Sequence, residues 1–267
     1  MNKKEKHILA LSGGKDSAAL AVYLMDKIPE LEYVFTDSGC ELPETYEYID
    51  RMEAILGIKV NKLPPRRSFR NWLQYKYGYL PSQRNRWCTL ELKLRPYQEY
   101  LNKTYENHTI YSYVGLRADE ESDREGFKTY QSNIIQCHPL KEDGLIYSDV
   151  ENILKSSGLG FPKYYQWRSR SGCFFCFFQK KREWISLYKN HPDLFLKAQE
   201  YENIAKGKGD KFTWCSDMSL NELINKYNTT DSEAYKKIQK RQALTLSHHI
   251  AKENILFQPL DITKLRK

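Results

Sequence analysis

A short glycine-containing loop near the start of the chain constrains the fold more than any other feature. Residues 12–17 read Ser-Gly-Gly-Lys-Asp-Ser, directly after the apolar run His7–Leu11, and a helical pattern begins within them. Glycine has no Cβ, so backbone N–H groups of such a loop can approach an anion closely, and the positive end of the helix faces the same point. Ser12, Ser17 and Lys15 add hydroxyl groups and a cation. The pattern predicts a strand, a phosphate-binding loop and a helix; a plain turn with a good N-cap is the alternative.

The first half of the chain alternates strand-like and helix-like patterns. Further strands are indicated at residues 31–36, 58–63, 109–114 and 133–137. Such alternation is typical of an α/β fold, in which helices cover a parallel sheet. From about residue 149 helical patterns dominate. We therefore expect a nucleotide-binding domain at residues 1–148 and a mostly helical C-terminal region at residues 149–267.

Two further polar loops directly follow predicted strands. One is Asp37-Ser38-Gly39 and the other is Gly115-Leu116-Arg117. Ligands of parallel sheets bind at the carboxyl ends of the strands, so both loops can face the same crevice as residues 12–17. An arginine at a strand end can hold a phosphate with two hydrogen bonds, which favours Arg117 as a phosphate ligand.

Two of the six cysteines form the motif Cys173-x-x-Cys176. In a cytoplasmic chain this spacing favours metal or redox chemistry over a structural disulfide. Thiolate ligands suit a [4Fe–4S] cluster or Zn²⁺, and spacing does not separate the two. The alternative is a pair of buried cysteines among phenylalanines.

The charge distribution points to a polyanionic partner. The formal net charge is +8, and residues 163–189 carry seven basic residues against one acidic residue, interleaved with aromatic rings. A second basic zone comprises Arg66, Arg67, Arg70, Arg84 and Arg86. Cations for phosphates together with rings for stacking suit single-stranded nucleic acid. The alternative places the rings in the core and the cations at a solvated rim, and for the phenylalanines we favour it.

The chain shows no targeting or membrane signal. No apolar run approaches the roughly 20 residues that a membrane-spanning helix needs. The apolar run after the basic N-terminus is shorter than that of a signal peptide. We expect a cytoplasmic protein that does not bind a membrane.

The three loops together resemble a known family. Ser-Gly-Gly-x-Asp-Ser after the first strand resembles the PP-loop of the ATP pyrophosphatase superfamily. Phe35–Gly39 and Gly115–Glu120 resemble motifs of its phosphoadenosine phosphosulfate reductase branch. The resemblance implies a Rossmann-like fold of the adenine nucleotide alpha hydrolase type, with the PP-loop domain at residues 1–148. It also implies ATP and Mg²⁺ as cofactors, with Thr36 near adenine and Asp37 near the ribose, the phosphates or Mg²⁺; a turn role is the alternative for Asp37.

The resemblance also bears on the cysteines. This branch often has a cysteine before a lysine-containing helix, which makes Cys88, ahead of Lys93, the third expected ligand. Cys215 is the fourth, preferred over Cys137 and Cys40. Nucleic-acid-thiolating members often carry an iron–sulfur cluster, so a [4Fe–4S] cluster is expected and Zn²⁺ is the alternative.

Residues 163–173 resemble the subgroup related to the DNA phosphorothioation proteins DndC and SspD. The resemblance implies adenylation by ATP, with release of pyrophosphate, coupled to sulfur transfer onto nucleic acid, DNA being favoured over tRNA. Expected partners are a sulfur donor such as a cysteine desulfurase and other modification-system proteins. One rival is a phosphoadenylyl or adenylyl sulfate reductase, although no cysteine follows Cys215 to act as its nucleophile. The other is a non-catalytic, zinc-stabilised nucleic-acid-binding module.

These inferences define the expected site. The residues expected to bind the nucleotide are Ser12, Gly13, Gly14, Lys15, Asp16, Ser17, Thr36, Asp37, Gly115 and Arg117. Lys15, Asp16 and Arg117 are the expected catalytic residues. The expected metal ligands are Cys88, Cys173, Cys176 and Cys215.

Overall fold

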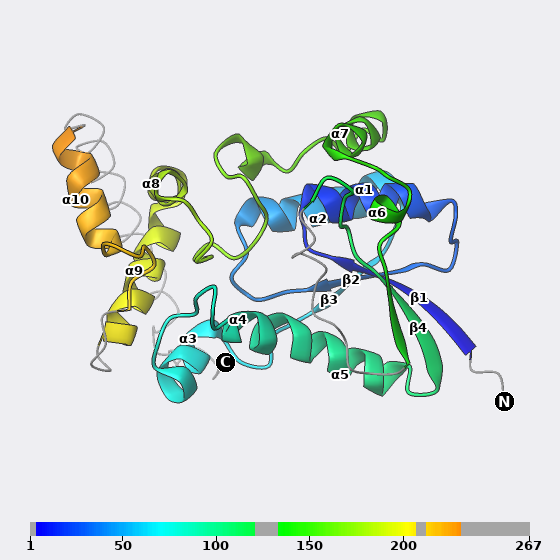
Figure 1. The fold of residues 1–267 in the computed structure, drawn as a ribbon, viewed down its shortest axis with the longest axis horizontal. Helices are drawn as coiled ribbons and strands as arrows, with labels where there is room; N and C mark the ends of the chain where they lie inside the picture. Colours follow the sequence, from blue (N-terminus) through cyan, green and yellow to red (C-terminus); the bar gives the residue numbers. More distant parts are fainter. Residues whose placement is uncertain (1–3, 121–132, 207–211, 231–267) are drawn as a thin grey trace, which may run out of the picture.

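A five-stranded parallel sheet forms the centre of the computed structural model, which describes residues 4–120, 133–206 and 212–230 (Figure 1). The strands are β1 (Lys4–Leu11), β2 (Glu32–Thr36), β3 (Val60–Leu63), β4 (His108–Tyr113) and β5 (Ile134–Cys137). Their order is β3-β2-β1-β4-β5, and every neighbouring pair is parallel. The order reverses between β1 and β4. The carboxyl ends of these two strands are therefore the switch point at which such sheets bind ligands.

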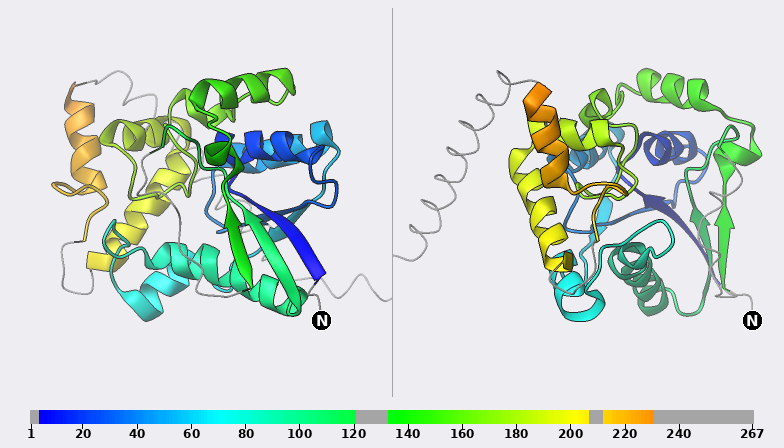
Figure 2. Two further views of the ribbon diagram at one scale, coloured as in Figure 1. Left: turned by 45° about the vertical axis from the view of Figure 1, so that its right-hand side comes forward. Right: turned by 60° about the vertical axis from the view of Figure 1, so that its left-hand side comes forward.

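Helices cover both faces of the sheet, as Figures 1 and 2 show. One face carries α1 (Lys15–Met25), α2 (Pro43–Leu56), α6 (Pro139–Glu142) and α7 (Tyr147–Ser156), and the other carries α5 (Arg95–Thr104). Side chains of a strand alternate between faces. Accordingly, Ile8 packs with Leu101 of α5, whereas Leu9 and Leu11 pack with α1 and α7. The predicted α/β fold, a parallel sheet with helices on both faces, is confirmed.

A second core lies beyond the carboxyl ends of the strands and is built from helices and aromatic rings. Its elements are α3 (Phe69–Trp72), η1 (Leu73–Tyr77), α4 (Trp87–Thr89), η2 (Leu90–Leu94), η4 (Lys163–Gln166), α8 (Lys181–Asn190), α9 (Pro192–Lys206) and α10 (Leu220–Thr230). Phe69 is at its centre, with ring centroids 3.9 Å from Phe175 and 4.8 Å from Tyr201. Helical patterns were predicted from about residue 149 onward, whereas α3 and η1 were not predicted.

The helical core draws on both halves of the chain, since residues 69–92 and 164–224 contribute to it. By contrast, α7 packs on α1 and belongs to the sheet layer. The expected division at residues 148 and 149 stays a prediction. The part of the C-terminal region beyond Thr230 lies outside the described residues. In the portion that the structure describes, no helix is both long and apolar enough to span a bilayer.

Candidate functional site

Residues 12–17 form the turn between β1 and α1, at the switch point of the sheet. Gly13 has φ +70°, a conformation that glycine adopts without the strain of a Cβ. The Ser17 hydroxyl donates to the Gly14 carbonyl at 3.1 Å and accepts from the Ser12 N–H at 3.1 Å. Gly14 is the N-cap of α1, and no side chain caps it. Since the first N–H groups of a helix have no partner within it, this N-terminus is suited to an anion.

The loop that follows β4 packs directly on residues 12–17. A Cβ added to Gly115 would lie 2.8 Å from the backbone carbon and oxygen of Asp16 and from the backbone nitrogen of Ser17. Only a glycine allows this approach. This contact places the two loops side by side, and the crevice that they are expected to share stays a prediction.

The segment that begins at η4 holds the opposite side of the loop. The buried Tyr164 hydroxyl donates to the Gly13 carbonyl at 2.7 Å. A Cβ added to Gly14 would lie 2.6 Å from the Ser171 Oγ. Residues 12–17, called the phosphate loop below after their predicted role, are therefore fixed by two segments that are distant from them in the sequence.

Two cations meet on the carboxylate of Asp16. Lys15 Nζ lies 2.6 Å from Asp16 Oδ1, and Arg117 donates to the same oxygen at 2.7 Å. Burial disfavours the guanidinium charge, but Asp119 and Asp16 more than compensate, so the pKa of Arg117 lies above its ordinary value. The ring of Tyr147 lies 5.0 Å from Lys15 Nζ. Lys15 in the loop and Arg117 beside it, both predicted to hold phosphates, are thus paired with Asp16, and Arg117 is also paired with Asp119.

The Asp37 carboxylate accepts hydrogen bonds from its own turn and from a tyrosine of α2. It accepts from the Gly39 N–H at 2.7 Å and from the Tyr46 hydroxyl at 2.8 Å. Thr36 is the last residue of β2 and pairs with Leu63 of β3. The turn role that the sequence left open for Asp37 is present, and the expected nucleotide contacts of Thr36 and Asp37 stay predictions.

A cavity of 150 Å³ opens beside the phosphate loop, and three cysteines line it. These are Cys88, Cys173 and Cys176, together with the cations Arg86, Lys93 and Arg170. Ser171, which abuts Gly14, belongs to the same lining. The cavity and the phosphate loop therefore share a wall.

A buried carboxylate lies behind this cavity. Glu41 accepts from the Ser38 hydroxyl at 2.8 Å and from Lys93 Nζ at 2.9 Å, and the Cys173 Sγ lies 3.8 Å away. Burial raises the pKa of the Cys173 thiol well above its usual range, and the charge of Glu41 raises it further. Burial works against the charge of Lys93, but Glu41 outweighs it, and the pKa of Lys93 stays above its ordinary value. The ligand-free site therefore holds Cys173 as a thiol.

Local backbone features place the cavity residues. In η2 the Arg95 N–H donates to the Leu90 carbonyl, an i→i+5 bond that makes one turn of π-helix. This wider turn brings Cys88 and Lys93, five residues apart, to one cavity. On the other wall the buried Arg168 donates to the carbonyl groups of Gly172 and Cys173, at 2.9 and 2.8 Å, which fixes the turn between the two motif cysteines.

The predicted four-cysteine metal centre is not assembled. Among the residues that the structure describes, no three His, Cys, Asp or Glu side chains form a group that could hold a metal ion. Cys88, Cys173 and Cys176 share the cavity, but Cys215 does not line it. Its neighbour Trp214 is fixed in the helical core by hydrogen bonds to Glu202 and Ala198, which holds Cys215 there. Burial raises the pKa of Cys88 to about 11, and burial and Glu202 that of Cys215 to about 11, so both are thiols at neutral pH. The described residues do not fit a [4Fe–4S] cluster or Zn²⁺.

In the basic and aromatic segment at residues 163–189, some rings are buried in the helical core and several cations form ion pairs. Phe174 and Phe175 are buried in the helical core, as the alternative interpretation held. Several cations have acidic partners, among them Lys163 with Glu47 and Lys181 with Asp217. The expected nucleic-acid surface stays a prediction. The two ion pairs leave fewer cations of this segment for contacts with phosphates.

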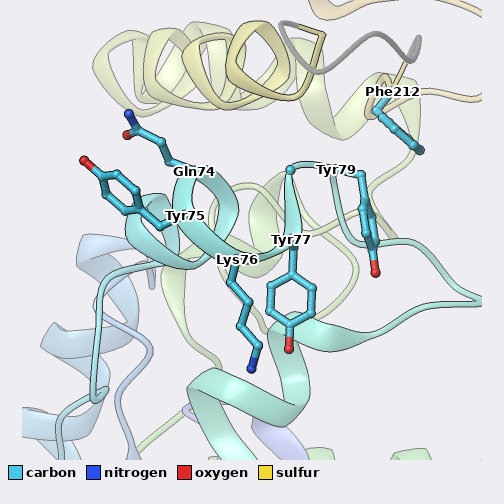
Figure 3. Close-up of a pocket in the computed structure, with 7 residues that line it drawn as sticks. Gln74, Tyr75, Lys76, Tyr77, Tyr79 and Phe212 are labelled. Atoms are coloured by element: carbon cyan, nitrogen blue, oxygen red, sulfur yellow. The ribbon is translucent and has the colours of Figure 1, made fainter.

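A second cavity, of 230 Å³, lies at η1 in the helical part (Figure 3). It is lined by residues 74–79 and by Phe212, whose ring centroid is 5.6 Å from that of Tyr79. Figure 3 shows Lys76 and Tyr77 pointing away from Phe212, and both side chains hydrogen-bond to the buried Glu91. Tyr75 is 75% exposed. This cavity shares no lining residue with the one lined by Cys88, Cys173 and Cys176, which is called the thiol cavity below.

A comparison with protein-family models assigns the chain to a known family. Residues 6–176 match the phosphoadenosine phosphosulfate reductase domain. The chain belongs to this family. The match contains the phosphate loop, the Arg117 loop and both motif cysteines, so the family assignment rests on the whole site.

Individual relatives of the family are distant. An uncharacterised protein of Methanocaldococcus jannaschii is 26% identical over 224 residues, which are 79% of this chain and 46% of that protein. A phosphoadenosine 5'-phosphosulfate reductase of Vibrio vulnificus is 24% identical over 162 residues, 60% of this chain and 62% of the enzyme. The solved phosphoadenylyl-sulfate reductase of Candida auris, in complex with phosphate, is 13% identical, covers 66% of this chain and 84% of that one, and gives a TM-score of 0.47. The chain spans about half the length of that Methanocaldococcus jannaschii protein and of a second protein of the same organism that it matches.

Sequence reasoning missed several residues of the site. Tyr164 and Gly13 are separated by 151 positions, and no local pattern signals their contact. Glu41 was not among the expected site residues, although it is a fully buried carboxylate.

Proposed function

We propose that this protein adenylates an oxygen of a nucleic acid with ATP, releases pyrophosphate, and then transfers sulfur to the activated position. The observation that carries the proposal is the shared wall at Ser171. A phosphate loop with two cations lies on one side of it and a thiol-lined cavity on the other. DNA is the favoured acceptor because of the resemblance of residues 163–173 to phosphorothioation proteins.

The phosphate loop supplies binding and charge stabilisation. Backbone N–H groups at the start of α1 receive the phosphates, and Lys15 and Arg117 turn from Asp16 to them. Mg²⁺ would be held by the phosphates together with Asp16, since it commonly binds one or two carboxylates plus phosphates, and would neutralise the leaving pyrophosphate. Thr36 and Asp37, at the end of β2, are the proposed neighbours of adenine and ribose.

The reaction proceeds in two displacements. A nucleic-acid oxygen attacks the α-phosphorus, and the bond to the pyrophosphate oxygen breaks. A sulfur nucleophile then attacks the activated centre and AMP leaves. Backbone N–H groups aimed at the developing negative charge give such sites most of their rate advantage. The proposed partners are a sulfur donor such as a cysteine desulfurase and other proteins of a nucleic-acid modification system.

Release of pyrophosphate from ATP tests the proposal. Asp16→Ala removes the anion that orients both cations, and we expect at least a hundredfold lower rate than wild type in a coupled pyrophosphate assay with DNA present. Asp26→Asn is the matched control, an exposed acid at the far end of the same helix, and should keep the wild-type rate. Equal release by wild type and Asp16→Ala would remove the ATP site from the account.

Reduction of a sulfonucleotide is the second candidate. The similarity to phosphoadenosine 5'-phosphosulfate reductases of Vibrio favours it. Thioredoxin-dependent release of sulfite from adenylyl sulfate or its 3'-phosphate would identify this activity, and sulfur transfer predicts none. The zinc-stabilised binding module loses its basis, because no cysteine-based group among the described residues could hold the ion.

A further inference from the structure

The ring of Tyr147 contacts both of the cations that are paired with Asp16. Its centroid lies 5.0 Å from Lys15 Nζ and 5.5 Å from the guanidinium carbon of Arg117. The face of an aromatic ring carries partial negative charge and attracts cations at such distances. The two side chains that the proposed function assigns to the phosphates of ATP therefore share one ring.

The start of α7 brings this ring to the site. Tyr147 is the first residue of α7, and helical side chains lean toward the N-terminus of their helix, here toward the two cations. The helix start is fixed by the Ile146 N–H, which donates to the Asp149 carboxylate at 2.8 Å. The ring of Phe161 lies against Tyr147, with the two centroids 6.2 Å apart. These contacts hold the ring in place in the ligand-free protein.

Tyr147 is also connected to Arg117 through the backbone. The Arg117 Nε donates to the Asp119 carboxylate at 2.7 Å. This hydrogen bond lowers the pKa of Asp119, and a hydrogen bond from the backbone N–H of Tyr147 lowers it further. Directly ahead of the helix, the Ala118 N–H donates to the Leu145 carbonyl at 2.9 Å. The loop that carries Arg117 is therefore attached to the start of α7.

The two cations benefit from being held before a ligand binds. Lys15 Nζ and Arg117 Nη1 lie 2.6 and 2.7 Å from the same oxygen of Asp16. Long basic side chains lose rotamer freedom when they are fixed, and a site that fixes them in advance spares the ligand this cost. A ring face makes no directional hydrogen bond. Both cations can therefore keep the ring as a partner while they turn from Asp16 to phosphates.

We propose that Tyr147 is a positioning residue of the phosphate site, whose ring aligns Lys15 and Arg117 before the nucleotide binds and thereby raises the affinity for ATP. The effect on ATP affinity rests on the proposed function, whereas the hold on the two cations rests on the ring contacts alone. Because the Tyr147 side chain is 43% exposed, its removal should leave the fold intact.

Calorimetric titration with ATP and Mg²⁺ tests the role in binding. We expect Tyr147→Leu to bind ATP at least fivefold more weakly than wild type, whereas Tyr147→Phe, which keeps a ring, stays within twofold. Trifluorophenylalanine in place of Tyr147 keeps a ring of similar shape but removes the negative charge of its face, so this protein should behave like Tyr147→Leu. Tyr23→Leu is the matched control, since its ring lies 3.4 Å from Lys27 Nζ toward the other end of α1, and should keep wild-type ATP affinity.

Proton NMR of the ligand-free protein tests the hold on the cations without ATP. Protons over the face of a ring are shifted upfield. The ε-methylene protons of Lys15, identified by their absence from Lys15→Arg, should lie upfield in wild type and in Tyr147→Phe and return to the ordinary lysine position in Tyr147→Leu.

Four results overturn the inference: an ordinary Lys15 shift in wild type, wild-type ATP affinity in Tyr147→Leu, wild-type affinity with trifluorophenylalanine, or an equal loss in Tyr147→Phe and Tyr147→Leu. An upfield Lys15 signal in a protein that binds no ATP supports the hold on the cations. That result refutes both the role of Tyr147 in nucleotide binding and the proposed adenylation.

Discussion

The contact between Gly115 and the phosphate loop gives the sharpest test of the site. In Gly115→Ala the new Cβ would meet three backbone atoms at 2.8 Å, whereas ordinary contacts begin at 3.4 Å. Gly115 is not among the glycines with positive φ, so alanine itself fits the backbone there. The two loops must therefore separate by about 0.6 Å. Since misplacement by 1 Å can cost about a hundredfold, we expect ATP affinity to fall roughly ten- to a hundredfold. Overpacking should also lower the free energy of unfolding by about 1–3 kcal/mol.

The assay is calorimetric titration with ATP and Mg²⁺, alongside urea unfolding. Gly144→Ala is the control, because its Cβ would meet nothing within 4 Å although φ is +72°. It should lose about 1 kcal/mol of stability through backbone strain and keep wild-type ATP affinity. A folded Gly115→Ala protein with ATP affinity within twofold of wild type would refute the reasoning that close packing of these loops shapes the phosphate site.

Three further outcomes follow from buried polar contacts. Tyr164→Phe leaves the Gly13 carbonyl without its donor and should lower the free energy of unfolding by about 1–3 kcal/mol in urea. Lys93→Met leaves the buried Glu41 carboxylate without its cation and should lower the free energy of unfolding by about 2–3 kcal/mol. This is less than the roughly 3–5 kcal/mol of a fully buried pair, because Lys93 is partly exposed. Adding Glu41→Gln should restore part of the lost stability, and a double variant that is no more stable than Lys93→Met would contradict this. Burial alone would raise the pKa of Glu183, but hydrogen bonds from backbone N–H groups lower it below 4.5. The ionised Glu183 therefore stabilises the folded state fully above that pH, and this contribution is lost as the pH falls through the lowered pKa. Glu183→Gln should therefore show a weaker loss of stability between about pH 5 and pH 3 than wild type, measured by urea unfolding across that range.

The sheet and the phosphate loop could be predicted from the sequence because their signals are local. Apolar runs of strand length marked four of the five strands within two residues, and the opening run before Ser12 marked the fifth. The switch-point rule predicted that the Arg117 loop and residues 12–17 lie at the same edge of the sheet. The structure adds that Arg117 donates to Asp16, 101 positions away, a contact that was not predicted.

The thiol cavity could be predicted only in part, because its composition depends on tertiary packing. The type of a residue indicates which ligand it can hold, not which neighbours it receives. Cys215 has the chemistry of a fourth ligand, yet the hydrogen bonds of Trp214 fix it elsewhere in the helical core. Glu41 and Lys93 are 52 positions apart, and nothing in either local sequence signals the ion pair. Each of these placements is set by packing of the helical core against the sheet.

The π turn in η2 makes the length of this segment as important as its chemistry. If the same residues formed ordinary α-helix, the extra residue of the turn would no longer be absorbed, and all that follows would rotate by about 100°. Lys93 would swing out of reach of Glu41, and α5, which continues the same helix, would present a different stripe to the underside of the sheet. The wide turn therefore sets how α5 is rotated relative to the cavity, and it ties the placement of Lys93 to the packing of α5 on the sheet.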